Sequence, residues 1–348
     1  MSAYFRMPSL NLPNPVFCDA SNLEFFLVMA DLDLIDRLFG FLGPDDIARL
    51  RRLNRRVYWS IESYSRRAWD IDHFLMKWFD RSVLVQFFDQ LERCNAVISG
   101  SAALQFLSRK SPYPTSDLDI FLPMENASQF GKWLQEDAGY IFKPRSLGMS
   151  IHFDYEIWSM PLRYHLLPGE SGMQSELSFG GKFDVFDFYK PAQGDAHHGA
   201  AERPHVQLIV VVGDPFKHIL SFHSTVVMNV ITARYAASLF PYSTFVRHVA
   251  WISRRGNYRG DYRQNWRVKY ESRGFKFVDD RTPAVRPIGH EFRAWRFLGD
   301  AGTWMIPFET RESPDQECVL LEREITFEVV LRSRGPVTTG SYLNIAPR

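Results

Sequence analysis

The sequence predicts a mixed α/β protein of the α+β kind, in which a mixed sheet with flanking helices follows a small helical segment. Three observations predict this class. Leucines and other apolar residues recur at helical spacing between residues 34 and 57. A strand, a turn, a short helix and a second strand follow one another between residues 97 and 121. A continuous apolar run at residues 205–212 is typical of a strand in the middle of a sheet.

The composition favours a folded protein of the cell interior. Of 348 residues, 45% are hydrophobic and 15% are aromatic, which disordered chains lack. The formal net charge of +1 gives the whole chain no electrostatic preference for nucleic acid or for an anionic membrane. The three cysteines, Cys18, Cys94 and Cys318, lie far apart without metal-ligand spacing, so we expect a cytoplasmic or nuclear protein. We expect no secretory signal, and no membrane-spanning segment, because the longest apolar run is too short.

The N-terminal part divides into a leader and a helical segment. Residues 1–22 contain three prolines and are expected to form a flexible leader. Residues 23–68 have a helical pattern, with an apolar face that includes Leu34, Leu38, Leu50 and Leu53. The sequence Gly43-Pro44-Asp45-Asp46 is expected to end one helix and to begin the next.

Residues 34–58 resemble an F-box. An apolar helix ends at a leucine before a Pro-Asp turn, and a leucine-rich helix with basic residues then leads to an aromatic residue, Tyr58. Asp31-Leu32-Asp33 departs from the family, which has Leu-Pro-x-Glu at that place. The resemblance implies that Leu34, Leu38, Leu50 and Leu53 bind a Skp-type adaptor of a cullin ubiquitin ligase. The alternative is a plain three-helix subdomain that packs on the rest of the chain.

A second motif pairs a Gly-Ser turn with an Asp-x-Asp strand. Gly100 and Ser101 stand between the first strand and the short helix, and Asp117 and Asp119 share one face of the second strand because they are two residues apart. Carboxylates are preferred ligands of Mg²⁺, which shares them with substrate phosphates. A glycine at a helix N-terminus lets the backbone approach an anion. The alternative is an ordinary turn before two solvated aspartates.

Residues 98–121 resemble the signature of the polymerase-beta-type nucleotidyltransferase superfamily, in which Gly-Ser or Gly-Gly precedes a strand carrying Asp-x-Asp. The resemblance implies a nucleotidyltransferase-like core over residues 69–245, a nucleoside triphosphate held by Gly100 and Ser101, and Mg²⁺ held by Asp117 and Asp119.

Active members of this superfamily generally carry a third carboxylate on a neighbouring strand. In this chain Gln207 is expected at that position, and an amide is a poor Mg²⁺ ligand beside charged alternatives. Four other acidic residues could supply the third carboxylate instead, since they are acids in the same part of the sequence: Asp154, Glu156, Asp184 and Asp187.

Further elements are expected around this core. The pattern predicts helices over residues 69–94 and 126–138, a hairpin-prone region up to residue 190, and a loop over residues 191–204 whose His197 and His198 are solvated rather than metal-bound. Asp214 and Pro215 are expected to begin a long helix that reaches Tyr235. His223 and Asn229 would then face a nucleotide pocket or, more simply, a helix interface. The order of the Gln207 strand, a turn and the expected helix with His223 and Asn229, followed by Phe275, resembles a group of fungal proteins with nucleotidyltransferase-like cores.

Residues 246–348 are expected to form a basic linker and a small subdomain with a strand at residues 325–331. Residues 251–270 interleave arginines and Lys269 with tryptophans and tyrosines, a combination that single-stranded nucleic acid contacts use. The nearly neutral whole chain favours a solvated linker instead.

The sequence therefore favours an F-box-like adaptor protein with a degenerate nucleotidyltransferase-fold core, in which Gln207 replaces an acid. The first alternative is a Mg²⁺-dependent nucleotidyltransferase that acts on an unknown acceptor, with Asp117 and Asp119 holding the metal. A further alternative is single-stranded nucleic-acid binding through residues 251–270.

Overall fold

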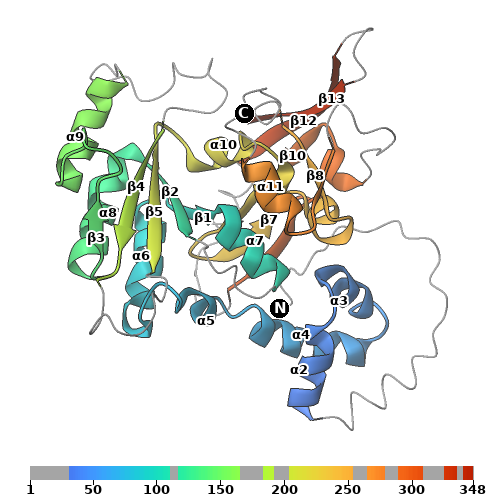
Figure 1. Ribbon diagram of the computed structural model, residues 1–348. Helices are drawn as coiled ribbons and strands as arrows, with labels where there is room; N and C mark the ends of the chain where they lie inside the picture. The colour runs from blue at the N-terminus through green and yellow to red at the C-terminus, as the bar shows by residue number, and fades with distance from the viewer. Residues whose placement is uncertain are drawn as a thin grey trace.

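A central eight-stranded sheet organises the computed structural model (Figure 1). The structure describes residues 31–109, 117–164, 183–191, 204–253, 265–278, 289–308, 325–334 and 340–347. The strands of this sheet are β1 (Val97–Ser99), β2 (Leu118–Pro123), β3 (Ile141–Lys143), β4 (Phe183–Tyr189), β5 (His205–Val211), β6 (Asn229–Ile231), β7 (Tyr235–Ser238) and β11 (Trp304–Pro307). Their order is β11-β7-β6-β1-β2-β5-β4-β3; β2 and β5 pair in parallel and the other neighbours are antiparallel. The predicted mixed α/β class is confirmed.

The described part of the N-terminal segment, from residue 31, contains the helices α2 (Leu32–Gly40), α3 (Pro44–Leu50) and α4 (Arg55–Ala68). Asp31 caps α2 by accepting a hydrogen bond from the backbone N–H of Leu34 at 2.7 Å. Gly43 is the N-cap of α3 and Pro44 is its first residue, as the sequence predicts. The leader expected over residues 1–22 lies outside the described residues.

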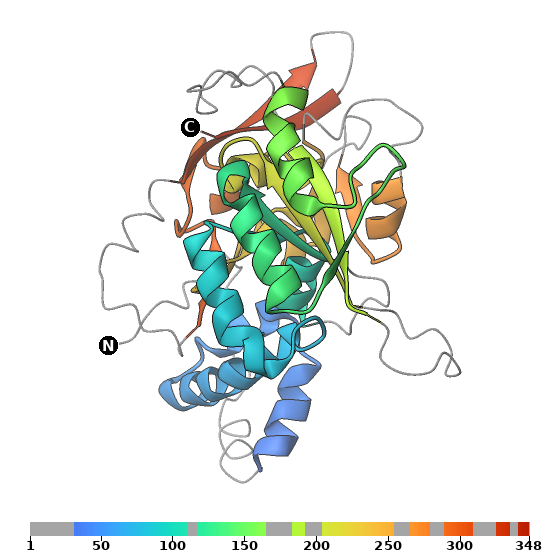
Figure 2. The same cartoon turned by 90° about the vertical axis from the view of Figure 1, so that its left-hand side faces the viewer.

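Helices before β1 and between the strands that follow cover one face of the sheet. They are α5 (Ile71–Leu75), α6 (Leu84–Arg93), α7 (Gly100–Ser108), α8 (Ala127–Glu136) and α9 (Phe153–Arg163), with 3-10 turns η1 (Arg81–Val83) and η2 (Met124–Asn126). Figure 2 shows α6, α8 and α9 side by side in front of the sheet. The region up to residue 190, expected to be hairpin-prone, instead contains α9, whose Phe153 ring packs against Gly131 of α8.

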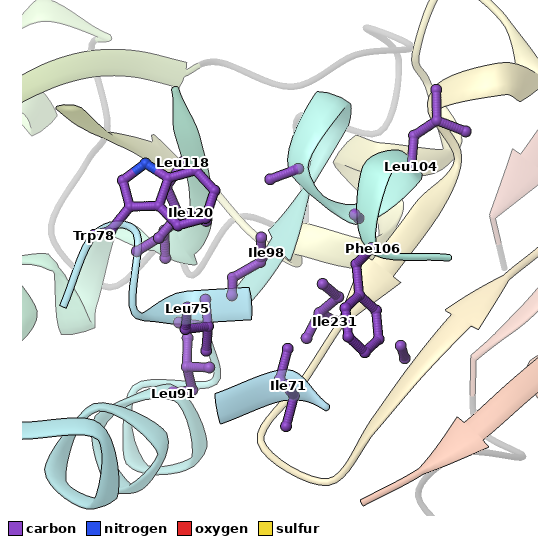
Figure 3. Close-up of a cluster of buried hydrophobic side chains, with 14 of the residues drawn as sticks. Ile71, Leu75, Trp78, Leu91, Ile98, Leu104, Phe106, Leu118, Ile120 and Ile231 are labelled. Carbon is purple, nitrogen blue, oxygen red and sulfur yellow. The ribbon is translucent and has the colours of Figure 1, made fainter. Parts of the chain in front are cut away.

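Strand residues that point to this face build the larger core cluster. Ile98 of β1, Ile120 of β2 and Leu208 of β5 are fully buried in it. Figure 3 shows Leu75 of α5 and Trp78, in the turn after it, near Ile98 and Ile120. Alternate residues of the same strands, including Phe121 and Ile209, pack into a second cluster on the opposite face. Both faces are therefore covered along much of the sheet, and each fully buried aliphatic side chain contributes about 1.5–3 kcal/mol.

One arginine joins the N-terminal segment to the core. Arg109 follows the last turn of α7 with a positive φ of 54°, and its guanidinium donates to the backbone carbonyls of Phe39 and Leu42 and to the hydroxyl of Tyr64. It also lies over the ring of Trp69 at 4.6 Å, and the indole N–H of Trp69 donates to the carbonyl of Leu107 at 3.1 Å. These contacts fix α2 and α4 to the end of α7.

The chain after β5 differs from the sequence prediction. The expected long helix to Tyr235 is wrong: α10 (Pro215–Leu220) is short, and a 3-10 turn η4 (Thr225–Val227), β6 and β7 follow it. A π-helical turn η5 (Tyr242–Val246), β8 (Val249–Trp251), α11 (Asn265–Glu271), β9 (Lys276–Val278) and a 3-10 turn η7 (His290–Phe292) come next.

The remaining strands are β10 (Trp295–Phe297), β12 (Thr326–Arg334) and β13 (Gly340–Pro347), which form a three-stranded sheet. The strand expected at residues 325–331 is β12. β11 joins the central sheet next to β7, so the sheet crosses the division expected after residue 245. Within the described ranges, no helix has both the length and the hydropathy needed to span a membrane.

Candidate functional site

A row of polar residues crosses five neighbouring strands on one face of the sheet. In register, Ser99 of β1 lies beside Asp119 of β2, Asp119 beside Gln207 of β5, Gln207 beside Asp187 of β4, and Asp187 beside Lys143 of β3. Residues paired in register point to the same face. The expected neighbourhood of Gln207 and Asp119 is therefore confirmed, and Asp187 lies on the other side of Gln207.

The turn at Gly100 holds the start of α7 against Asp119. Gly100 has a φ of +68°, which favours glycine, and a Cβ atom there would lie 2.5 Å from Oδ2 of Asp119. A side chain at this position is therefore both strained and in collision with the carboxylate. The Gly-Ser turn was expected to bring the backbone close to a bound anion, and in the structure the group that lies closest to Gly100 is the carboxylate of Asp119.

His205 bridges two aspartates of the site. Its Nδ1 lies 2.6 Å from Oδ1 of Asp117, and its Nε2 lies 2.9 Å from Oδ1 of Asp187. The imidazole is stacked on the ring of Tyr189, with 4.2 Å between ring centroids. Although burial opposes the charged form, hydrogen bonds to Asp117 and Asp187 raise the pKa of His205 to about 9. A cationic imidazolium therefore lies between the two carboxylates at neutral pH.

The negative charge of Asp187 is balanced by cationic neighbours. Arg145, after β3, donates to both of its carboxylate oxygens at 2.5 and 2.9 Å, and the amide of Gln207 donates to Oδ1 at 3.1 Å. Burial alone would favour the protonated acid, but hydrogen bonds from His205 and Arg145 lower the pKa of Asp187 to about 2. Asp187 is thus an ionised carboxylate whose oxygens are already occupied.

Asp119 has the opposite electrostatic character. Burial, followed by repulsion from Asp117, raises the pKa of Asp119 to about 7, against a weaker attraction from Lys269. The site therefore contains one carboxylate that titrates near neutral pH, beside another that is ion-paired with His205.

Residues from the C-terminal part lie over the Gly-Ser turn. The hydroxyl of Tyr270, in α11, is 3.2 Å from the hydroxyl of Ser101, and Nη1 of Arg273 donates to the same hydroxyl at 3.2 Å. Lys269 adds a positive charge that interacts with Asp119 and Asp117. Cations thus approach the start of α7 from a segment about 170 residues away in sequence.

Three of the four substitute acids do not join this cluster. Glu156 and Asp184 form ion pairs with Arg163 at 2.8 and 2.6 Å, and Asp154 is exposed on α9. Only Asp187, among these candidates, lies beside Gln207. His197 and His198 lie outside the described residues.

His223 and Asn229 are packed inside the protein rather than in a helix interface. The His223 ring stacks on Trp266 with 3.9 Å between centroids, and burial followed by the charge of Lys269 lowers the pKa of His223 to about 3. Asn229 begins β6 and donates to the carbonyl of Val226 at 2.8 Å. Neither belongs to a long helix. Phe275, quoted for the fungal likeness, is buried.

The sequence analysis missed His205, Arg145 and the contact of Arg273 with Ser101. His205 carried a usable signal, because it is two residues before Gln207 and so shares its face of the strand. Arg145 and Arg273 gave none, because their positions depend on loops and strand pairings distant in sequence.

Three of the four N-terminal leucines are exposed to solvent. Leu34, Leu38 and Leu53 are 48%, 39% and 50% exposed, and Leu50 is partly buried. Phe41, directly after α2, is 89% exposed. An adjacent side of α2 packs through Ile35 and Phe39, which are buried. Part of the apolar surface formed by these leucines is therefore accessible.

The rings expected to stack on nucleic acid are mostly buried where the structure describes them. Trp251 and Tyr270 are buried, and Trp266 packs between His223 and Phe277. Residues 254–264 of this segment lie outside the described residues. The described part of the segment therefore offers no row of exposed rings.

Within the described residues, no group of three or more histidine, cysteine or acidic side chains is arranged to hold a metal ion. Comparison of the chain with protein-family models, curated protein sequences and solved structures finds no match among any of the three.

Proposed function

We propose that this protein is an F-box-like adaptor whose nucleotidyltransferase-like core no longer catalyses transfer. The observation that carries the proposal is the exposed apolar surface of the N-terminal segment, formed by Leu34, Leu38 and Leu53 with Phe41 beside them. The occupant would be an apolar helical surface of a Skp-type adaptor. Burial of a leucine is worth about 1.5–3 kcal/mol, so covering half of three leucines would supply a few kcal/mol.

The charge balance of the core supports the non-catalytic part of this proposal. Asp187 accepts from Arg145, Gln207 and His205, and Asp117 is paired with His205. A catalytic pair of Mg²⁺ ions needs several free carboxylates. The imidazolium of His205 already provides the positive charge between Asp117 and Asp187, so a cation would have to displace it. On this proposal the core binds a client protein or a nucleotide.

A binding measurement with purified components tests the adaptor proposal. The Leu34→Glu, Leu38→Glu double variant should lose binding to a purified Skp-type adaptor in calorimetry. Val85→Glu is the matched control, because Val85 is 78% exposed on α6, away from α2. Binding that persists in the Leu34, Leu38 double variant would remove the adaptor proposal.

A Mg²⁺-dependent nucleotidyltransferase is the second candidate, favoured by the cations over the Gly-Ser turn. In this candidate Ser101, Lys269 and Arg273 bind triphosphate oxygens, and Asp117 and Asp119 hold Mg²⁺, which neutralises charge on the transferred phosphoryl group. Burial, followed by repulsion from Asp117, raises the pKa of Asp119, and one divalent ion beside the two carboxylates would relieve that repulsion.

Calorimetry also tests this second candidate. If it is right, the chain should bind ATP or another common triphosphate only when Mg²⁺ is present, and the Asp117→Asn, Asp119→Asn double variant should not bind. Binding without the metal, or the absence of binding for all common triphosphates, would exclude the catalytic candidate.

A further inference from the structure

The exposed residues of α4 all lie on one face of the helix, and this face is basic. They are four arginines, a tryptophan and a serine: Arg55, Arg56, Trp59, Ser63, Arg66 and Arg67. With about 3.6 residues in each turn, these positions occupy about a third of the circumference of the helix. The buried residues Val57, Ile61 and Tyr64 occupy the other side. No acidic residue belongs to these six, which we call the α4 face.

The first turn of α4 carries positive charge that its surroundings do not balance. Arg55 and Arg56 occupy this turn, which contains no acidic residue. Among the described residues, none forms a hydrogen bond or an ion pair with either of them. The N-terminus of a helix is the positive end of its dipole, so two arginines there are unfavourably placed. An anion beside them would relieve this repulsion.

The tryptophan of the α4 face lies between its two pairs of arginines. Trp59 is 55% exposed, although its ring contacts Tyr58 with 5.2 Å between centroids. It is four residues after Arg55 and three after Arg56, so the three side chains are neighbours on the helix surface. Tryptophan and arginine are the residues that most often dominate the binding energy of protein interfaces. The α4 face therefore combines unbalanced cations with a large accessible ring.

The charges around α4 distinguish a short anionic partner from a long one. Residues 47–68 contain seven arginines and one glutamate, whereas residues 31–46 contain five aspartates and one arginine. The acidic α2 lies beside α4, because Asp36 pairs with Arg67 at 2.6 Å (Figure 1). A nucleic acid longer than α4, which is about 21 Å in length, would meet these aspartates and be repelled. An acidic protein segment of limited length would not, and arginine forms two hydrogen bonds with one carboxylate.

We propose that the α4 face binds a short acidic segment of a partner protein. Carboxylates of the segment pair with Arg55 and Arg56 at one end and with Arg66 at the other, and an apolar side chain covers Trp59. The two ends are eleven residues apart, which is about 16 Å along the helix. The α4 face contains none of the four N-terminal leucines, so this site is separate from the adaptor site and does not depend on it.

Fluorescence anisotropy of the full chain with a labelled synthetic peptide tests the proposal. The probe is a helical peptide of about 15 residues with two glutamates near each end and leucine at its centre. Its control has glutamine in place of every glutamate. The glutamate peptide should bind at least about 10-fold more tightly than the control at about 50 mM NaCl, and this difference should shrink as the salt concentration rises, because exposed charges are screened.

Two double variants test whether the α4 face is the site. Arg55→Gln, Arg56→Gln should weaken binding of the glutamate peptide by roughly 10-fold and remove most of the salt dependence. Arg81→Gln, Arg93→Gln removes the same charge from exposed positions before and on α6, and should bind like the wild type. Trp59→Ala should weaken binding and leave its salt dependence unchanged, because the ring contributes apolar contact.

Three outcomes would overturn the proposal. The first is equal affinity of the wild type for the two peptides, including binding of neither. The second is an equal loss of affinity in the two double variants, because the attraction would then not belong to the α4 face. The third is a single-stranded oligonucleotide of similar length that binds the wild type more tightly than the glutamate peptide and is lost in Arg55→Gln, Arg56→Gln. Thermal unfolding of that variant should match the wild type, so that unfolding does not explain its loss of binding.

Discussion

Stability should fall as His205 loses its proton. The folded protein raises the pKa of His205 from 6.5 to about 9, so the imidazolium is stabilised relative to the unfolded chain. This stabilisation is fully present below pH 6.5 and is lost as the pH rises to about 9. At about 1.4 kcal/mol for each pKa unit, the loss amounts to about 3 kcal/mol. The side chain of His205 is only 16% exposed, so solvent screens the interaction little.

Urea unfolding across this pH range provides the assay. The free energy of unfolding of the wild type should decrease by about 3 kcal/mol between pH 6.5 and about 9, and His205→Gln should remove most of that decrease. His73→Gln is the control, because His73 is exposed on α5, and it should retain the decrease. An equal pH dependence in wild type and His205→Gln would refute the bridging role of the imidazolium. Titration of His205 by NMR should give a midpoint near 9.

Three other changes have defined outcomes. Gly100→Ala should lower the thermal stability of the protein by more than Gly139→Ala does. Both glycines have a positive φ, but only at Gly100 would a Cβ atom collide with a carboxylate, that of Asp119. Equal losses of stability in the two variants would contradict this collision. Arg109→Met should lower the free energy of unfolding by about 2–4 kcal/mol and speed hydrogen exchange in α2. Arg93→Met, which removes an exposed ion pair with Asp89, should have little effect on either. Unchanged hydrogen exchange in Arg109→Met would mean that Arg109 does not fix α2. Gln207→Glu should raise Mg²⁺ affinity in calorimetry if the core is a degenerate enzyme, and unchanged affinity would argue against that origin.

Local patterns carried the correct parts of the fold. The strand, turn and helix around Gly100 were predictable because glycine, short apolar runs and period-two alternation act within a few residues. The neighbourhood of Gln207 and Asp119 followed from the strand order that the motif implied. The capping residues around Gly43 were equally local.

The failed helix to Tyr235 shows where such patterns stop. Residues 225–231 include Thr225, Val226, Val227, Val230 and Ile231, whose branched side chains suit strands as well as one face of a helix. Pairing of β6 with β1 decides between the two, and that contact links residues more than 130 apart. Helical spacing alone could not show it.

The electrostatic state of the site was also beyond local reasoning. Asp187 was one of four equal candidates by composition, and its pairing with Arg145, His205 and Gln207 depends on β4 lying next to β5. From the sequence, Asp117 and Asp119 looked alike. In the folded chain Asp117 pairs with His205, whereas burial and repulsion from Asp117 raise the pKa of Asp119 to about 7.

The contacts of Arg109 have a geometric consequence for any protein bound at α2. Since the guanidinium and Trp69 attach the N-terminal helices directly to the end of α7, no free tether separates them from the sheet. A partner docked on Leu34 and Leu38 would be carried at a set angle to the central sheet. Whatever the core recognises would then be presented to that partner in one orientation. A flexible linker would instead allow a wide range of orientations.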